Sequence, residues 1–600
     1  MKSNIPFVLI AIAGLSARGQ NVGTATPSFN HVAAQAAETP AAATSLPAPA
    51  MANDAKSDDN VMFVPKLAGV VVYGNRDSVK AEEGITNFSG VRVDGVSFVT
   101  TKEVAAIVNP YLGKPATKGS VRAIERDLIR LSRKNDHPVV DVTLPEQNVD
   151  SGVIQLVILE GKVGKVIVEH TGRTWFSTNY TRNNIRLQPG DSIKESKLID
   201  DINWLKQDPS FRDVNVAFRQ GGLGSTADVV VQEQDHFPLE ANIGFDNAGV
   251  KIVGQDRVTG GLTWANVFGT SQKLDYEYTT DTDFNYLRAH SAIWTIPLPW
   301  RNTLTIFGSY ANMTSDFKAI GIQDGPDEKG VNDQLSVRYA IPLPRLGRYT
   351  HELSLGFDYK YANNNLNFGS GFGPSGLIDF PTEIEQFTGA YRAILPYSIG
   401  QTSLDAEGFY SPGDWSSVNT SGAFNLARAG ATADYWYAKG SLEQLVNLPA
   451  DFSFDVRGTV QWADANLLPS EEFTLGGVET VRGYYERTAN GDKGFLVNTE
   501  LRSPSIALGS LFNSSIPDTL QFIAFCDYGY VEVDKGPALT GYEYDNKLAS
   551  VGGGIRYNLN KYLAVRLDYG YQLIRDAALL SQAGYNSGPW MGHISVVARF

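Results

Sequence analysis

The chain has 600 residues, a formal net charge of −14 and a single cysteine. One thiol cannot form an internal disulfide, and the acidic balance argues against a nucleic-acid partner, which needs clustered lysine and arginine. The length exceeds that of one compact domain of roughly 150 residues, unless much of the chain forms a single large barrel.

The N-terminus has the pattern of a secretory signal peptide over residues 1–19. Lys2 gives the positive start, an apolar run follows over residues 5–15, and small residues end the segment. The run is shorter than the roughly 20 residues that a helix needs to cross a bilayer. No longer apolar run follows, so we expect any membrane insertion to use strands in a closed barrel. Residues 20–61 are rich in Ala, Pro and Thr, and this composition predicts a flexible linker.

Two small α+β domains are predicted, over residues 62–161 and 162–235. Each has the order strand, helix, helix, strand, strand, so the two form a tandem pair. The helix 118–134 is the clearest element, because apolar residues such as Val121 and Leu128 recur at spacings of three and four. The predicted elements are 91–96, 100–112, 118–134, 139–143 and 152–159 in the first domain, and 163–169, 178–187, 193–205, 214–219 and 227–232 in the second.

Residues 236–600 are predicted to form a transmembrane β-barrel of about 16 antiparallel strands. Helical periodicity stops after Pro238, and segments of alternating character follow, near the roughly 9–11 residues that a tilted membrane strand needs. The connections alternate between short and long, as periplasmic turns and surface loops do in outer-membrane barrels. The short ones are 269–271, 342–348, 396–400, 447–451 and 558–561, and the long ones are 316–331, 363–379, 411–433, 469–494 and 575–589.

Residue parity within the predicted strands agrees with a barrel. In residues 520–530 one face carries only apolar or aromatic side chains and Cys526, whereas the other carries Gln521 and Asp527. A charge that faces lipid at mid-bilayer costs about 2–4 kcal/mol, so Asp527 is expected to point into the lumen. The chain ends on Phe600, and a terminal aromatic on an apolar face resembles the signal that barrel-assembly machinery reads.

Two motifs lie late in the barrel region. They are Val481-Arg482-Gly483-Tyr484, in the loop 469–494 between the expected eleventh and twelfth strands, and Phe525, Asp527 and Gly529 on the next strand but one. Together with the paired N-terminal domains and the terminal aromatic, they resemble the two-partner secretion (TpsB-type) transporters. These are the haemolysin secretion/activation proteins, within the superfamily that includes the barrel-assembly factors. The resemblance implies a transmembrane β-barrel preceded by two POTRA-like periplasmic domains.

The resemblance also implies roles for the motif residues. In such transporters the loop folds back into the barrel, and here Arg482 is expected to meet Asp527 on the inner wall. A guanidinium can pair with a carboxylate through two charge-assisted hydrogen bonds, which fixes the loop tip. Gly483 permits a tight turn, and Tyr484 offers a flat face and a hydroxyl. No amphipathic plug helix is predicted in residues 20–61. In this respect the chain departs from family members that carry such a helix.

The function implied is outer-membrane export of an unfolded partner exoprotein, adhesin- or cytolysin-like, with the N-terminal domains in the periplasm. Capture of the partner would use β-augmentation, in which an extended segment pairs with an exposed strand edge, and the candidate edges are 214–219 and 227–232. Barrel-assembly machinery and outer-membrane lipid are the other expected partners. No nucleic acid, cofactor or metal is expected.

Three other functions compete with export. The seven histidines are scattered and no pair has metal-ligand spacing, so an enzyme is not expected. A barrel-assembly insertase would share both motifs, but such factors tend to carry more N-terminal domains. A plain diffusion porin leaves residues 62–233 without a purpose.

Overall fold

The computed structural model describes residues 59–206, 211–222, 226–316, 318, 327–367, 377–509, 517–534, 545–576 and 588–600. The expected signal peptide, residues 1–19, and the linker up to residue 58 lie outside the described residues. The chain divides into an N-terminal unit that ends at Pro238 and a second unit that begins at Leu239.

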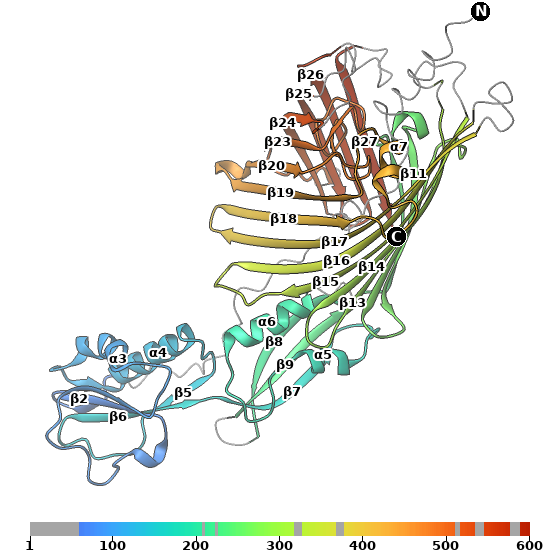
Figure 1. Cartoon of the computed structure of the whole chain (residues 1–600). Coiled ribbons are helices and arrows are strands. Elements are labelled where there is room, and N and C mark those ends of the chain that lie inside the picture. Colours follow the sequence, from blue (N-terminus) through green and yellow to red (C-terminus); the bar gives the residue numbers. More distant parts are fainter. Residues whose placement is uncertain are drawn as a thin grey trace, which may run out of the picture. The chain divides into compact units, whose positions relative to one another are not determined.

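The first N-terminal domain is a four-stranded sheet in the order β3-β2-β6-β5, with two helices packed on it (Figure 1). Thr100 begins α3 with a capping box to Glu103, and α4 buries Val121 and Leu128 against the sheet. The helix predicted over 100–112 ends at Val108 and continues as the 3-10 turn Asn109–Tyr111, because Pro110 has no N–H for the α-helical bond. The bounds are β1 (Met62–Val64), β2 (Gly69–Tyr73), η3 (Arg76–Ser78), β3 (Gly90–Asp94), α3 (Thr101–Val108), η4 (Asn109–Tyr111), β4 (Ala116–Thr117), α4 (Lys118–Lys134), β5 (Val140–Thr143) and β6 (Val153–Glu160).

The second N-terminal domain is a three-stranded sheet in the order β7-β9-β8 with two helices. Its elements are β7 (Lys162–His170), α5 (Thr178–Asn184), α6 (Glu195–Lys206), β8 (Phe211–Gln220) and β9 (Thr226–Asp235). The predicted capture edge 227–232 is wrong, because it lies in β9. That strand pairs with β7 on one side and β8 on the other, so its backbone groups are already used. The other candidate, 214–219, lies in β8 at an edge of the sheet.

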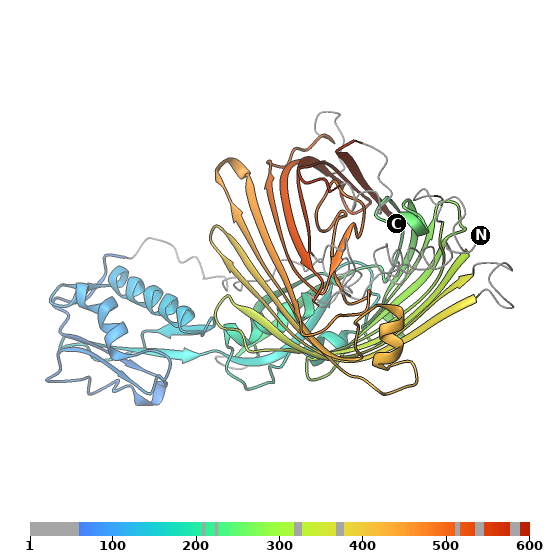
Figure 2. The same cartoon turned by 45° about the horizontal axis from the view of Figure 1, so that its top comes forward.

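Sixteen antiparallel strands form a closed barrel, as predicted (Figure 1). Successive strands run side by side round the wall, which Figure 2 shows from a second direction, and β27 returns to pair with β10. The strands are β10 (Leu239–Asp246), β11 (Arg257–Val267), β12 (Gln272–Asp281), β13 (Leu287–Pro297), β14 (Thr303–Thr314), β15 (Asp327–Pro342), β16 (Thr350–Asn367), β17 (Leu377–Tyr397), β18 (Gly400–Pro412), β19 (Asp434–Asn447), β20 (Ser453–Ala463), β23 (Lys493–Arg502), β24 (Asp518–Glu532), β25 (Asp545–Leu559), β26 (Leu563–Gln572) and β27 (Trp590–Arg599).

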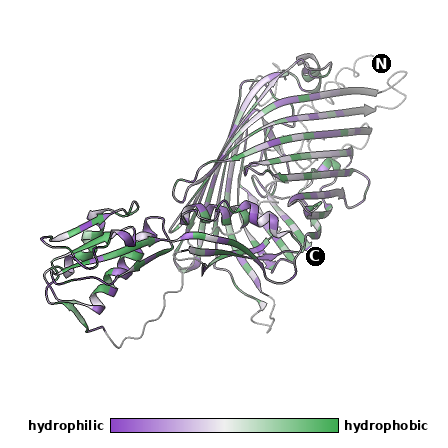
Figure 3. Cartoon of the chain, turned by 90° about the horizontal axis from the view of Figure 1, so that it is seen from below, coloured by the Kyte–Doolittle hydropathy of each residue, from purple (hydrophilic) through white to green (hydrophobic). Residues whose placement is uncertain are grey.

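Hydrophobic and hydrophilic residues alternate along the barrel strands (Figure 3). On β24, Phe522, Cys526 and Tyr528 are exposed, whereas Phe525 and Asp527 are buried on the opposite face. This parity is the one expected when apolar side chains meet lipid and polar ones face the lumen. Separately, none of the helices in the described parts of the chain is both long and apolar enough to cross a membrane.

Two of the long connections carry their own secondary structure. The connection 464–492, here named loop 6, joins β20 to β23 and contains a small hairpin, β21 (Phe473–Leu475) paired with β22 (Ala489–Gly491). Loop 6 begins and ends earlier than the predicted 469–494, because β23 already starts at Lys493. The helix α7 (Ser421–Ala427) follows β18 and lies against β17. Two 3-10 turns, η5 (Lys251–Val253) and η8 (Pro449–Asp451), complete the described elements of the barrel unit.

Candidate functional site

Loop 6 is fixed to the inner wall through Arg482. Its Nε donates to Asp527 Oδ2 and its Nη2 to Asp527 Oδ1, both at 2.8 Å, while its backbone N–H donates to Oδ2 at 3.1 Å. Both side chains are buried, at 2% and 0% exposure. The structure therefore brings the two residues together in the two-point geometry that a planar guanidinium makes with a carboxylate.

Further groups hold this pair in place. Glu500 on β23 forms a second ion pair with Arg482, and the guanidinium carbon lies 3.8 Å from the centre of the Phe525 ring. Asn498 donates from the same Nδ2 to Asp527 Oδ1 at 2.8 Å and to the carbonyl of Thr480 at 2.6 Å. Asn498 thus ties the wall carboxylate to the loop backbone. The motif predicts neither Glu500 nor Asn498, because both lie on another strand.

Gly483 forms the turn at the tip of loop 6. Its φ of +89° lies in the left-handed region, and a Cβ there would come within 3.0 Å of the Gly570 backbone. Its N–H donates to His593 Nε2 at 3.0 Å, and its carbonyl accepts from Gln572 Nε2 at 2.6 Å. Because His593 accepts through Nε2, the neutral ring carries its proton on Nδ1. The last two strands therefore hold the backbone of the tip.

The other motif residues hold the loop through contacts of the Tyr484 hydroxyl and through close packing. The Tyr484 hydroxyl lies 2.9 Å from the carbonyl oxygen of Ala549 and 2.5 Å from that of Ile574. Val481 is fully buried in a cluster with Leu475. A Cβ at Gly529 would lie 2.5 Å from Leu475, so the wall glycine leaves room for the β21 side chain.

Two more clusters fix the base of loop 6. Glu471 accepts from Lys360 Nζ at 2.6 Å, from the Tyr437 hydroxyl at 2.7 Å and from Gln386 Nε2 at 3.1 Å. Arg428, just after α7, pairs with Asp492 at 2.5 Å. No motif points to Glu471, Asp492 or Arg428, since each depends on a partner far away in the sequence.

Phe600 lies apart from the loop site. Its backbone N–H donates to the Ala241 carbonyl at 2.9 Å and its carbonyl accepts from the Ala241 N–H at 3.3 Å, at the seam between β27 and β10. Its side chain is 75% exposed. Phe600 thus ends the strand that closes the barrel.

A barrel of this strand number, preceded by small α+β domains and penetrated by a loop, agrees with what sequence comparison finds. The sequence matches the haemolysin secretion/activation proteins ShlB/FhaC/HecB over residues 225–368 and 395–557, just over half of the chain. The chain belongs to this ShlB/FhaC/HecB family. Residues 87–161 of this family member also match the ShlB-type POTRA domain.

Individual relatives and solved structures support the same assignment. The heme/hemopexin transporter protein HuxB of Haemophilus influenzae is 22% identical over 498 residues, which cover 78% of this chain and 81% of HuxB. The outer membrane transporter CdiB of Dickeya dadantii is 21% identical over 499 residues, 77% of this chain and 78% of CdiB. The structure of CdiB from Escherichia coli has a TM-score of 0.65 at 15% identity, covering 93% of this chain and 94% of that one. BamA from Haemophilus ducreyi lacking POTRA domains 1–3 has a TM-score of 0.51 at 13% identity, covering 86% and 100%, and this likeness is one of fold.

Membership of the ShlB/FhaC/HecB family decides between the competing functions. The chain is an outer-membrane transporter of the two-partner secretion type, it secretes a partner exoprotein, and it is not an enzyme. The barrel lies in the outer membrane and the N-terminal POTRA-like domains lie in the periplasm. Family membership thus favours export of a partner protein over diffusion through a porin or barrel assembly as the main activity of this chain.

Proposed function

We propose that the partner exoprotein crosses the barrel unfolded, and that loop 6 is the element that must yield to it. The Arg482–Asp527 pair carries this proposal, because a loop held inside a barrel by a buried ion pair occupies space that a passing chain needs. Separating the loop from the wall while Asp527 stays buried would leave that carboxylate without its cation, and an uncompensated buried charge costs about 3–5 kcal/mol, so the pair favours the seated loop. Loop 6 residues Val481, Arg482, Gly483 and Tyr484 and wall residues Phe525, Asp527 and Gly529 form the proposed gate.

The exposed edge of β8 is the proposed receptor for the partner. Among the described strands β8 pairs with β9 alone, so its second edge is available for β-augmentation. Arg212, Asp213 and Asn215 are exposed along it. Such polar side chains limit uncontrolled edge-to-edge pairing while leaving the backbone able to bind an extended segment.

The remaining partners follow from the surfaces of the molecule. The proposed cargo is a large adhesin- or cytolysin-like protein, and barrel-assembly machinery is proposed to read Phe600 during biogenesis. The outward apolar face of strands such as β24 meets outer-membrane lipid. The acidic net charge argues against a nucleic-acid partner. We assign residues 62–161 and 162–235 to the two POTRA-like domains and 236–600 to the barrel.

The first experiment compares secreted proteins in cells with and without this chain, in the medium and in the periplasm. We expect one large species to disappear from the medium while other outer-membrane barrels stay at normal levels. A general loss of barrels would instead identify an assembly factor and overturn the proposal.

The receptor edge needs a separate test. A photo-crosslinking residue placed at Asn215 on β8 is expected to capture the partner exoprotein during export. Lys165, which is exposed on β7 at the opposite edge of the same sheet, is the matched control position. Crosslinks from Lys165 in place of Asn215 would show that the edge assignment is wrong.

A further inference from the structure

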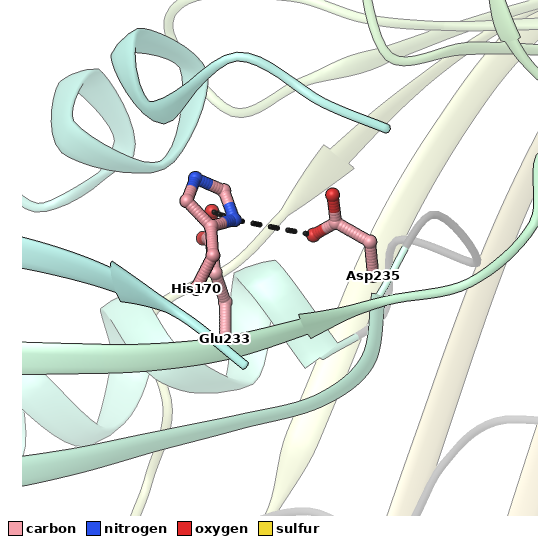
Figure 4. Close-up of side chains that lie close together, drawn as sticks. All are labelled: His170, Glu233 and Asp235. Atoms are coloured by element: carbon pink, nitrogen blue, oxygen red, sulfur yellow. Dashed lines mark ion pairs between the residues drawn. The ribbon is translucent and has the colours of Figure 1, made fainter. Parts of the chain in front are cut away.

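Three ionisable side chains converge at one end of the sheet in the second N-terminal domain (Figure 4). His170 ends β7, while Glu233 and Asp235 lie two residues apart on β9 and so share one face of that strand. Parallel pairing sets His170 opposite Glu233. The His170 Nδ1 atom lies 3.0 Å from Glu233 Oε1 and 3.7 Å from Asp235 Oδ1.

The cluster is buried, and the outer oxygen atoms of its two carboxylates are already hydrogen-bonded. Both carboxylate side chains have 0% exposure and the His170 side chain has 15%. Glu233 Oε2 accepts from the Thr181 hydroxyl on α5, and Asp235 Oδ2 accepts from the backbone N–H groups of Trp175 at 2.6 Å and Phe176 at 3.0 Å. These bonds orient both carboxylates, as outer hydrogen bonds orient the ligands of metal sites.

The inner atoms are different, because they face one another without a hydrogen bond. His170 Nδ1, Glu233 Oε1 and Asp235 Oδ1 make none to any described group. Burying carboxylates is costly, and two facing carboxylates repel each other unless a positive charge lies between them, which either a protonated His170 or a metal ion supplies. The arrangement thus favours a cation at the point where the three atoms meet.

We propose that His170, Glu233 and Asp235 form a binding site for a divalent transition-metal ion, with Zn²⁺ as the best fit. The three atoms all lie within 4.8 Å of one another. Ligands about 2.0–2.2 Å from a tetrahedral zinc lie roughly 3.3–3.6 Å apart, so small side-chain shifts suffice. An imidazole with two carboxylates suits zinc or manganese, whereas Ca²⁺ and Mg²⁺ prefer oxygen ligands alone. Water would supply the fourth ligand.

A bound ion would act as a clamp within the domain. It joins the ends of β7 and β9, and the same two carboxylates hold the backbone at Trp175 and Phe176 and the side chain of Thr181. The connection between β7 and α5 is therefore fixed to the sheet through the metal ligands. This role is independent of the gate proposed for loop 6.

The test measures metal bound to the full chain, purified in detergent micelles without a polyhistidine tag and stripped with chelator. After dialysis against Zn²⁺, elemental analysis is expected to find one equivalent in the wild type that His170→Ala, Glu233→Gln and Asp235→Asn each lose. Asp235→Asn is the most selective variant, because it removes the negative charge while its amide oxygen can still accept the hydrogen bonds from the backbone N–H groups of Trp175 and Phe176. His137→Ala is the matched control: His137 pairs with Glu160 at 2.7 Å, outside the three-residue cluster.

The outcomes separate a metal site from a histidine–carboxylate ion pair. A wild type that binds no more Zn²⁺ than the three single variants would overturn the proposal, and so would binding that each of the three substitutions leaves intact. Hydrogen exchange gives a second readout. Exchange over residues 171–181 should slow when Zn²⁺ is added to the wild type and stay unchanged in Asp235→Asn, and an unaltered wild-type rate would refute the clamp.

Discussion

Arg482 does three things at once that no other cation could do in its place. Its planar guanidinium bonds both oxygens of Asp527, its edge reaches Glu500, and its face lies over Phe525. A lysine ammonium is a point charge, so it cannot reproduce the paired hydrogen bonds to the carboxylate or the stacking on the Phe525 ring. At this scale the anchor depends on shape as much as on charge.

Replacing Arg482 with Ala is expected to abolish export while the barrel still assembles. The substitution leaves Asp527 buried without its cation, whereas Glu500 keeps its ion pair with Arg502. The unpaired Asp527 charge costs about 3–5 kcal/mol, which unseats the loop. The partner exoprotein in the medium gives the export readout, and the shift of the folded barrel on an unheated gel gives the assembly readout. Arg392→Ala is the control, because Arg392 is itself about half-exposed in its ion pairs with Asp405 and Glu407 and lies outside loop 6 and its partners. Undiminished export by the Arg482 variant would remove the pair from the mechanism.

Gly483→Ala is expected to loosen the loop tip without touching any charge. The left-handed φ of +89° strains any side chain by about 1–3 kcal/mol, and the added methyl would press on the Gly570 backbone. Hydrogen exchange over residues 478–488 should become faster. Gly408→Ala is the control, because a Cβ at Gly408 meets no atom within 4 Å. Equal exchange in the two variants would mean that the tip tolerates a side chain.

At the residue scale the sequence predicts one part of the site and misses another. Arg482 and Asp527 could be placed together because the family resemblance implies that their two motifs meet, and strand parity independently turns Asp527 inward. His593, Gln572 and Asn498 could not, since each acts through a contact with the folded-back loop 6, far from it in the sequence or on another strand, and has no local pattern. The metal cluster was missed for the same reason, because the parallel pairing of β7 with β9 creates it.

At the scale of elements, the local sequence pattern predicts where strands and helices lie in the chain better than it predicts which strands pair with one another. The range of α4 follows from its apolar spacing and matches the structure. The strand 227–232 was also found, yet its position in the middle of the sheet was not, because strand order is set by long-range pairing. The strand β2 lies outside the predicted elements: its five residues are all buried, so they lack the alternation that marks a half-exposed strand.

The helix α4 also carries a carboxyl group whose ionisation opposes folding at neutral pH. Burial raises the pKa of Glu125 to about 7, Arg122 lowers it in part, and Asp141 raises it further. A carboxyl whose pKa is raised on folding is penalised as the pH rises from its unfolded value of about 4.5 towards 7. The folded state therefore loses stability across that window and recovers it as the pH falls.

Glu125→Gln is accordingly expected to stabilise the first domain at pH 8 and to leave it unchanged at pH 4. Because Glu125 is only half-buried, we expect a gain of about 1–2 kcal/mol. Hydrogen exchange over residues 118–134 of the full chain, compared with the wild type at each pH, measures it. Glu82→Gln, an exposed carboxylate in the same domain, should show no difference at either pH. A gain that persists at pH 4 would mean that packing, and not charge, explains the effect.

At the scale of the whole molecule, the barrel follows from a pattern that no single strand reveals. The segments of alternating character predict about sixteen strands, and the structure confirms that number. Their connections alternate between short and long. The alternation exists because one barrel rim needs only tight turns while the other carries loops such as loop 6. Closure itself depends on the pairing of the first strand with the last, where Phe245 lies opposite Val596 and the chain ends at Phe600.

Phe600 can act in assembly through its ring or through its backbone, and two variants separate these roles. Phe600→Ala keeps the backbone bonds to Ala241 and removes only the ring, whereas deletion of Phe600 removes both. If assembly machinery reads the aromatic, both variants should fall several-fold in the outer membrane, as measured by immunoblot of isolated membranes. Phe522→Ala is the control, since it removes an exposed outward ring from the middle of the wall at β24 and should assemble normally. A normal level of Phe600→Ala with a low level of the deletion would assign the role to the seam between β27 and β10, because only the backbone pairing differs between the two variants.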